Sequence, residues 1–411
     1  MHSGAADVHA ASFRTQAETV IRGVRAALAE LVAAIDLDPM QPQELARRIG
    51  VDKSLSWKIS RLIREDDSWA AVPHFPGKTG FRIFVDSARK AGAPQTSVER
   101  VKKALGEFDR FVVEHSGDRE TLLMMAGGAS ERAARESGET HRRLAFRGQS
   151  ATWGVQARVH LSLHFVAPAR RAGLVDAATV GGLIDFRRLR PDVAWSFATI
   201  ARYIGDGRAA PVSPLEAIDA RLGPGEPPLL GEFSTKPLPL VRAVPVREGV
   251  ERIELAEGPV GRSAAATVLS GWFHRNAYSI YRTEEDQFGE HFVNLSTPTE
   301  LVIHDLYAHQ ALRAVLPPTN SVYSNLPAGQ TYSPAARDKG LLPVGTEVTL
   351  LGGNPPALVA PEVSFYEPLV QSVFGRLGWN ADDFLGFRFR LKYPPIPSVA
   401  VFRYPLPEKP A

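Results

Sequence analysis

The sequence contains no cysteine, which excludes disulfide frameworks, cysteine-ligated zinc or iron–sulfur centres, and thiol nucleophiles. An excess of charge of either sign is also missing. Lys and Arg number 48 against 45 Asp and Glu, which gives a formal net charge of +3 over 411 residues. So small an excess does not mark a chain coated in nucleic acid, and it leaves room for a local basic face.

Long apolar runs and targeting signals are absent as well. No window approaches the ~20 apolar residues that a membrane-spanning helix needs. The first residues, Met-His-Ser-Gly-Ala-Ala-Asp-Val-His, lack the basic and apolar regions of a secretory signal peptide. The sequence therefore predicts a cytoplasmic protein with no membrane partner.

The common catalytic and cofactor motifs are missing too. No Gly-x-Ser-x-Gly nucleophile elbow and no P-loop occurs, and Gly223-Pro224-Gly225 lacks the third glycine of a dinucleotide site. We therefore assign no catalytic residue, no metal ligand and no cofactor from the sequence.

The length suggests two or three domains, and the patterning changes character near residue 150. The sequence predicts an α+β fold, with a helical domain at 1–128, a linker or surface helix at 129–150, and a larger β-rich α+β domain at 151–411. The Pro- and Gly-rich stretch at 223–235 is a candidate boundary within the larger domain.

Helical periodicity marks residues 12–37, 97–115 and 118–126 in the N-terminal part. Thr96 or Ser97 is expected to cap the second of these helices, and Gly127-Gly128 to end the third. Residues 69–85 fit either a β-hairpin or a helix that starts at Thr79. We favour the helix because residues 86–90 continue its pattern and Gly92 would close it.

Short strand-like runs recur in the C-terminal part, beginning with an alternating, half-buried run at 155–166. The other predicted strands are 239–246, 251–255, 291–295, 300–304, 346–351, 386–392 and 398–404. Two helices are predicted between them, near 304–315 and 365–378.

Residues 42–64 form the most informative segment. They read as a short helix, a left-handed turn at Gly50, and a second helix that begins at Lys53 and is capped by Asp52. In the second helix, Leu55, Ile59 and Leu62 are predicted to face inward, and Ser54, Ser56, Lys58 and Arg61 outward. The segment carries six basic residues against two acidic ones.

The run Glu-Leu-Ala-Arg-Arg-Ile-Gly-Val-Asp-Lys-Ser, residues 44–54, resembles the helix-turn-helix of bacterial transcription regulators. Ser56 departs from that pattern, because it stands where the family usually has a β-branched core residue. The resemblance implies a partner, double-stranded DNA, and a homodimer or larger assembly that reads two half-sites. The candidate DNA-binding residues are Arg47, Arg48, Lys53, Ser54, Ser56, Trp57, Lys58 and Arg61.

This interpretation makes the chain a transcription regulator whose C-terminal domain senses a small-molecule effector or drives assembly. The amphipathic helix at 97–115 is a candidate dimerisation element. A first alternative is a self-assembling structural protein that uses the helix-turn-helix as a scaffold. The absent catalytic motifs and the modest net charge also agree with this alternative.

A second alternative is a hydrolase or metal enzyme with a His/carboxylate site near 274–309. The candidate residues are His274, Glu284, Glu285, Asp286, Glu290, His291, His304 and His309. On the helix predicted there, His304 would lie near the N-cap, about 140° around the axis from His309, which disfavours shared metal binding. His160 and His164 would lie about 13 Å apart on one strand face, too far to bind one ion.

Overall fold

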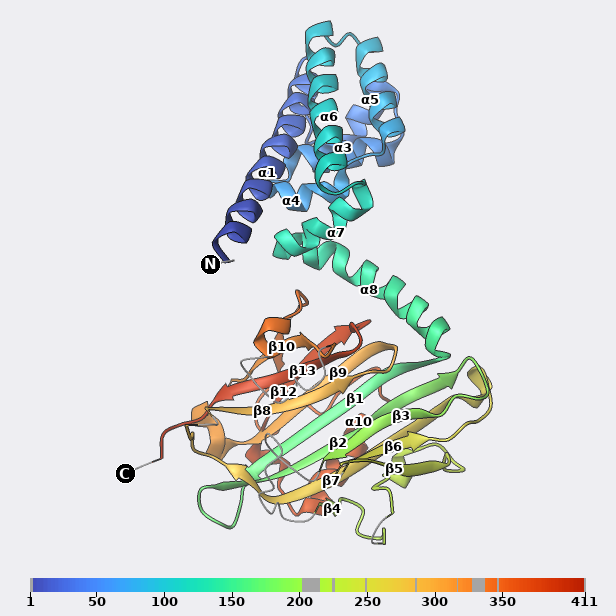
Figure 1. Ribbon diagram of the computed structural model, residues 1–411, viewed down its shortest axis with the longest axis vertical. Coiled ribbons are helices and arrows are strands. Elements are labelled where there is room, and N and C mark those ends of the chain that lie inside the picture. Colours follow the sequence, from blue (N-terminus) through green and yellow to red (C-terminus); the bar gives the residue numbers. More distant parts are fainter. Residues whose placement is uncertain are drawn as a thin grey trace. The chain divides into compact units, whose positions relative to one another are not determined.

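The computed structural model describes residues 3–201, 215–223, 226–247, 250–284, 287–315, 317–326, 337–345 and 347–409. The chain divides into two compact units, residues 1–138 and 139–411. The fold is mixed α+β, with N-terminal helices followed by a sheet-rich region (Figure 1).

Unit 1 is helical. Its elements are α1 (Ser3–Ala33), α2 (Pro42–Ile49), α3 (Lys53–Arg64), α4 (Ser68–Ala71), α5 (Lys78–Lys90), α6 (Gln95–His115), α7 (Arg119–Ala129) and the first part of α8 (Glu131–Trp153). The helices predicted at 12–37, 97–115 and 118–126 are confirmed, with changes at their ends. Pro94 precedes α6 without a side-chain cap, so the caps expected from Thr96 or Ser97 are wrong, and α7 continues through Gly127-Gly128.

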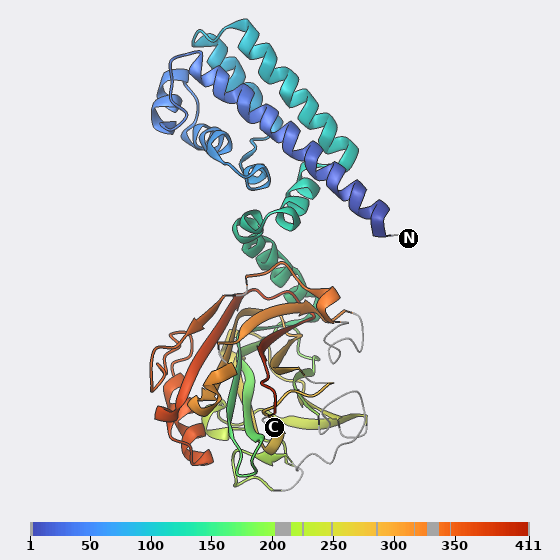
Figure 2. The same ribbon diagram turned by 90° about the vertical axis from the view of Figure 1, so that its left-hand side faces the viewer.

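The long helices α1 and α6 run side by side and form the frame of unit 1 (Figure 2). The apolar stripe of α6, which includes Val98, Val101, Phe108 and Phe111, is buried inside this unit. It is therefore not available as the dimerisation face that the sequence suggested. Residues 78–90 form α5, which confirms the helix and rules out the hairpin for this segment.

Unit 2 is built on strands, which form three sheets among the described residues. The largest has the order β11-β12-β9-β1-β2-β7-β4, and the smaller ones are β10-β13-β8 and β3-β6-β5. The strands are β1 (Val155–Pro168), β2 (Leu174–Arg188), β3 (Trp195–Ala201), β4 (Glu216–Ala217), β5 (Val241–Arg247), β6 (Val250–Leu255), β7 (Ala266–Ser279), β8 (Phe288–Leu295), β9 (Thr299–His309), β10 (Thr319–Ser324), β11 (Val348–Leu350), β12 (Phe384–Lys392) and β13 (Ser398–Pro405).

The large sheet is covered on both faces (Figures 1 and 2). Helix α10 (Tyr366–Leu377) packs on one face against Leu301, Ile303 and Tyr307 of β9. The other face packs against the β10-β13-β8 sheet through Val302 and Leu306 of the same strand. Burial on both sides explains why β1 is a nearly continuous buried run and not the half-buried strand that its alternation predicted.

The helix predicted near 304–315 is wrong. Residues 299–309 form β9, and only 310–315 make a 3₁₀ turn after it. β9 lies parallel to β1 and antiparallel to β12, in the middle of the large sheet. A central strand is buried on both faces, so apolar residues occur on both and its sequence lacks the period-2 alternation that would distinguish it from a helix.

A buried charge pair links this sheet to α10. Arg388 of β12 lies opposite Asp305 of β9 and donates from Nε and Nη2 to its carboxylate, the Nη2–Oδ2 distance being 2.7 Å. Tyr366 of α10 donates to the same carboxylate, and its hydroxyl lies 2.8 Å from that of Tyr307. Asp305 has no exposed surface.

We expect Asp305→Asn to lower the free energy of unfolding of unit 2 by about 3–5 kcal/mol, because it leaves the Arg388 cation buried without a counter-charge. Glu408→Gln is the matched control, since it breaks an exposed pair with Arg282 and should cost less than about 1 kcal/mol. Denaturant titration of the full chain measures both. Equal effects of the two substitutions would contradict the role given to the buried pair.

Candidate functional site

The turn between α2 and α3 has the geometry that the sequence predicts. Gly50 ends α2 with φ of 69°, in the left-handed region, and its N–H donates to the Ala46 carbonyl. Asp52 caps α3, accepting a 2.7 Å hydrogen bond from the Ser54 backbone N–H. Hydrogen bonds from Ser54 lower the pKa of Asp52, so the cap remains ionised at neutral pH.

One predicted contact residue is misplaced. Ser56 is fully buried, and its hydroxyl donates to the Pro42 carbonyl at the start of α2. Ser60, one turn later, is also buried and donates to the Pro39 carbonyl. Ser56 thus occupies the inward position that the family pattern gives to a β-branched residue, and it cannot face a partner. Its small side chain has its polar atom satisfied by the neighbouring backbone.

The remaining predicted residues lie on the surface of unit 1. Lys53, Ser54, Trp57 and Lys58 are exposed on α3, and Arg61 is half-buried beside them. Trp57 keeps 49% of its surface exposed, although Arg61 lies 5.3 Å from its ring centroid and His74 packs edge-on at 6.1 Å. These two contacts hold an aromatic side chain in a fixed place on the exposed face of α3.

The exposed face of α3 is basic over its whole length. Its sequence carries four cations and no acid, and Arg64 continues the row beyond Arg61. Lys53, Lys58 and Arg64 form no ion pair with any residue that the structure describes. On α2, Arg47 and Arg48 are exposed, and Arg47 lies 4.0 Å from Glu44. The site therefore combines unpaired cations with one exposed aromatic ring.

Unit 2 contains a second, different polar group, a cluster of buried histidines. It lies on the face of the large sheet that packs against the β10-β13-β8 sheet. The ring centroid of His164 on β1 lies 5.1 Å from that of His304 on β9 and 5.3 Å from that of His291 on β8. His160, two positions before Ser162 on β1, is also buried.

Hydroxyl groups surround part of this cluster. His291 Nε2 lies 3.2 Å from the Tyr278 hydroxyl and 3.1 Å from that of Tyr404, and His164 Nε2 lies 3.1 Å from Ser162 Oγ. Both ring nitrogens of His304 lack a hydrogen-bond partner among the described residues. Burial lowers the pKa of His160 and of His164 to about 4, and those of His291 and His304 well below their usual range. The cluster is therefore neutral at physiological pH.

The His/carboxylate site considered near 274–309 does not assemble among the described residues. His304 lies inside a strand, not near a helix N-cap, and His309 lies on the opposite face of β9 against Phe384. Glu290 pairs with Arg337 and Arg403. Glu284 is exposed, and Glu285 and Asp286 lie outside the described residues. In the described part of the chain, no three His, Asp or Glu side chains are placed to hold one metal ion.

Sequence reasoning missed this cluster because it treated His160 and His164 apart from the 274–309 stretch. Parallel pairing of β1 with β9 brings them together across more than a hundred residues. The available signal was the row of polar residues His160, Ser162 and His164 on one face of a strand whose opposite face is apolar. Buried polar side chains of this kind imply polar partners from other strands.

Comparison of the chain with known protein families, with curated proteins and with solved structures finds no match. Within the described residues, no helix has both the length and the apolar character needed to cross a bilayer.

We expect the stability of unit 2 to fall as the pH is lowered from about 6.5 to about 4. In that range the unfolded chain binds protons on His160 and His164 that the folded chain does not bind, because their folded-state pKa is lowered to about 4. Each such histidine contributes about 1.4 kcal/mol per pH unit. The free energy of unfolding, measured by urea titration at several pH values, shows this slope.

His164→Gln removes one titrating group, so its slope should be shallower by about 1.4 kcal/mol per pH unit. His141→Gln is the matched control, because His141 is exposed on α8 and is solvated in both states. A His164→Gln slope equal to that of the unsubstituted chain would show that this imidazole is not kept neutral by burial.

Proposed function

We propose that this chain binds double-stranded DNA, with α2 and α3 acting as a helix-turn-helix and α3 lying in the major groove. The observation that carries the proposal is the exposed face of α3, where Lys53, Lys58 and Arg64 have no acidic partner among the described residues. An α-helix fits the major groove, and unpaired cations along it neutralise phosphates on both sides.

The distribution of charge supports this proposal better than the total charge does. The whole chain has a formal net charge of +3, whereas residues 42–64 alone have six basic and two acidic side chains. A concentrated basic helix on a nearly neutral protein directs the duplex to one face. Binding would then be dominated by local contacts and would fall with salt concentration.

Trp57 and Ser54 are the side chains best suited to base edges. Ser54 carries a hydroxyl that can donate or accept in the groove, and the Trp57 ring offers an apolar surface for a thymine methyl group. Both are exposed in the first half of α3. Lysines on either side of them would set the register against the phosphates.

A single helix of this kind reads only a half-site, so we propose that two copies act together as a transcription regulator. The apolar stripe of α6 is excluded as their contact, because it is buried in unit 1. Unit 2, which is about twice the size of unit 1, is then the candidate for sensing an effector or for assembly.

We expect Lys53→Ala/Lys58→Ala to weaken duplex binding by about tenfold or more and to reduce the slope of log affinity against log salt by about 2. Lys103→Ala is the matched control, since this lysine is exposed on α6, outside α2 and α3. Fluorescence anisotropy with a labelled duplex, repeated at several salt concentrations, measures both quantities. Arg61 is left in place because its loss would also disturb Trp57.

Three results would overturn the proposal. The first is that the unsubstituted chain enriches no duplex from a random pool. The second is that the double variant binds DNA as well as the Lys103→Ala control does, and the third is that binding does not depend on salt. Light scattering on the same samples reports the size of the assembly. A large assembly that ignores DNA would favour the structural alternative.

A further inference from the structure

A pocket of about 730 Å³ opens at the edge of the large sheet in unit 2. Its walls come from the segment between β4 and β5, which is fastened to β7. The Leu230 N–H donates to the Leu269 carbonyl, the Gly271 N–H donates to the Pro228 carbonyl, and the Ser234 hydroxyl accepts from the Leu269 N–H. Ile218 and Leu230 of the same segment lie in the core against α10. These described parts of the pocket wall are therefore anchored to β7 and to the core of unit 2.

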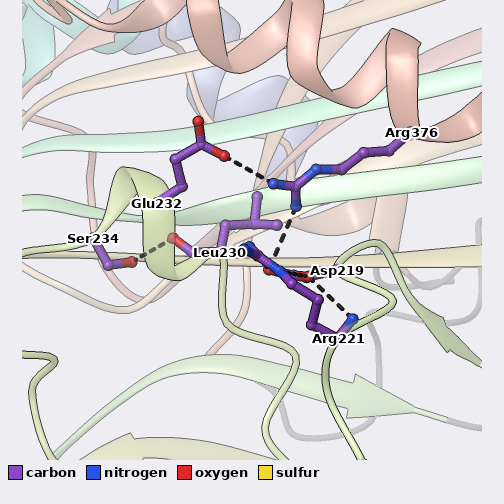
Figure 3. Close-up of polar contacts among 6 residues, drawn as sticks. All are labelled: Asp219, Arg221, Leu230, Glu232, Ser234 and Arg376. Atoms are coloured by element: carbon purple, nitrogen blue, oxygen red, sulfur yellow. Dashed lines mark hydrogen bonds and ion pairs between the residues drawn. The ribbon is translucent and has the colours of Figure 1, made fainter.

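A row of ion pairs joins Arg221, Asp219, Arg376 and Glu232 (Figure 3). All of these except Arg376 line the pocket. Asp219 is nearly buried and accepts two hydrogen bonds from the Arg221 side chain, at 2.8 Å and 2.6 Å. Arg376 of α10 lies 3.6 Å from Asp219 and donates to Glu232 at 2.9 Å. Hydrogen bonding from Arg221 lowers the pKa of Asp219 to about 2, so this carboxylate stays ionised.

The third carboxylate of the pocket is also engaged, because Glu226 accepts from the Gly223 N–H at 3.1 Å. Lys236 differs from these charged residues in having no charged or hydrogen-bonding partner among the described residues. Its ammonium lies near Gly231 at the pocket wall, 3.6 Å from where a Cβ on that glycine would stand.

The rest of the lining is apolar. It consists of Leu222, Pro227, Leu229 and Leu238, and Leu238 remains 44% exposed. The lining thus combines four apolar side chains with five charged ones, and a cavity of this volume is in the size range of small-molecule sites.

We propose that this pocket binds a small organic monocarboxylate with an apolar body, its carboxylate paired with Lys236 and its body against the leucine side chains. One unpaired cation matches one negative charge. Arg221 and Arg376 already pair with Asp219 and Glu232, so Lys236 is the lining cation left for a ligand. Glu226 has no ion pair among the described residues, so its carboxylate disfavours a second negative charge on the ligand, as in phosphate. The site lies within unit 2 and does not depend on DNA binding.

The test uses benzoate as the probe and the full chain without DNA. Isothermal titration or ligand-detected NMR should show saturable benzoate binding with a dissociation constant on the order of 1 mM, as expected for so small a ligand. Benzamide keeps the ring without the charge, and acetate keeps the charge without the ring. Each should bind at least tenfold more weakly than benzoate, and inorganic phosphate should not compete.

Lys236→Met keeps an unbranched side chain, one heavy atom shorter, and removes the charge. We expect it to weaken benzoate binding at least tenfold while leaving benzamide binding unchanged. Lys339→Met, an exposed lysine outside the pocket, is the matched control and should bind benzoate normally. The proposal is overturned if benzoate does not bind saturably, if benzoate and benzamide bind equally, or if Lys236→Met binds benzoate as well as the control does. None of these results bears on the DNA-binding proposal, which is tested separately on α3.

Discussion

The fully buried pair of Asp305 and Arg388 is the interaction on which the architecture of unit 2 depends. The two residues face each other across β9 and β12, and Tyr366 brings α10 to the same carboxylate. Successive residues of a strand point to opposite faces, so a register slip of one position would move Asp305 into the interior between the sheets. There Arg388 and Tyr366 would no longer be its partners. The pair thus specifies which face of β9 receives α10, even if two apolar residues could match its contribution to stability.

The same alternation places His304 on the other face of β9, next to Asp305 in the chain but in a different environment. Burial lowers the pKa values of the histidine cluster and keeps it neutral. Burial also raises the pKa of the Asp305 carboxyl, and the neighbouring Arg388 guanidinium opposes that rise. The two faces of β9 therefore bury polar groups differently, one as neutral histidines and the other as an ion pair. The cluster of neutral imidazoles loses stability in mild acid, because its histidines bind protons more readily in the unfolded chain than in the folded one.

Local patterns in the sequence predicted local structure well and long-range pairing poorly. The left-handed turn at Gly50, the Asp52 cap and helix α5 follow from short-range chemistry, so they could be predicted. Strands β2, β3, β7 and β10 were missed. β9 was partly taken for a helix, because a central strand buried on both faces carries no period-2 signal. The pocket could not be predicted from the sequence either. Asp219, Lys236 and Arg376 are separated in sequence, and only the pairing of the 227–235 segment with β7 and the position of α10 bring them together.

Ser56 shows why the candidate DNA-binding face is narrower than the sequence suggested. A hydroxyl at this position looks suited to a partner, yet the crossing of α2 over α3 buries it, and the Pro42 carbonyl satisfies it. The two acids that adjoin α3 are also engaged or buried, since Asp52 caps its first turn and Glu65 is buried at its end, and Asp66 follows as an exposed acid. The exposed face is left with Lys53, Lys58 and Arg64 around one aromatic ring. Its positive character comes from where the structure places these groups, because the composition of the chain as a whole is close to neutral.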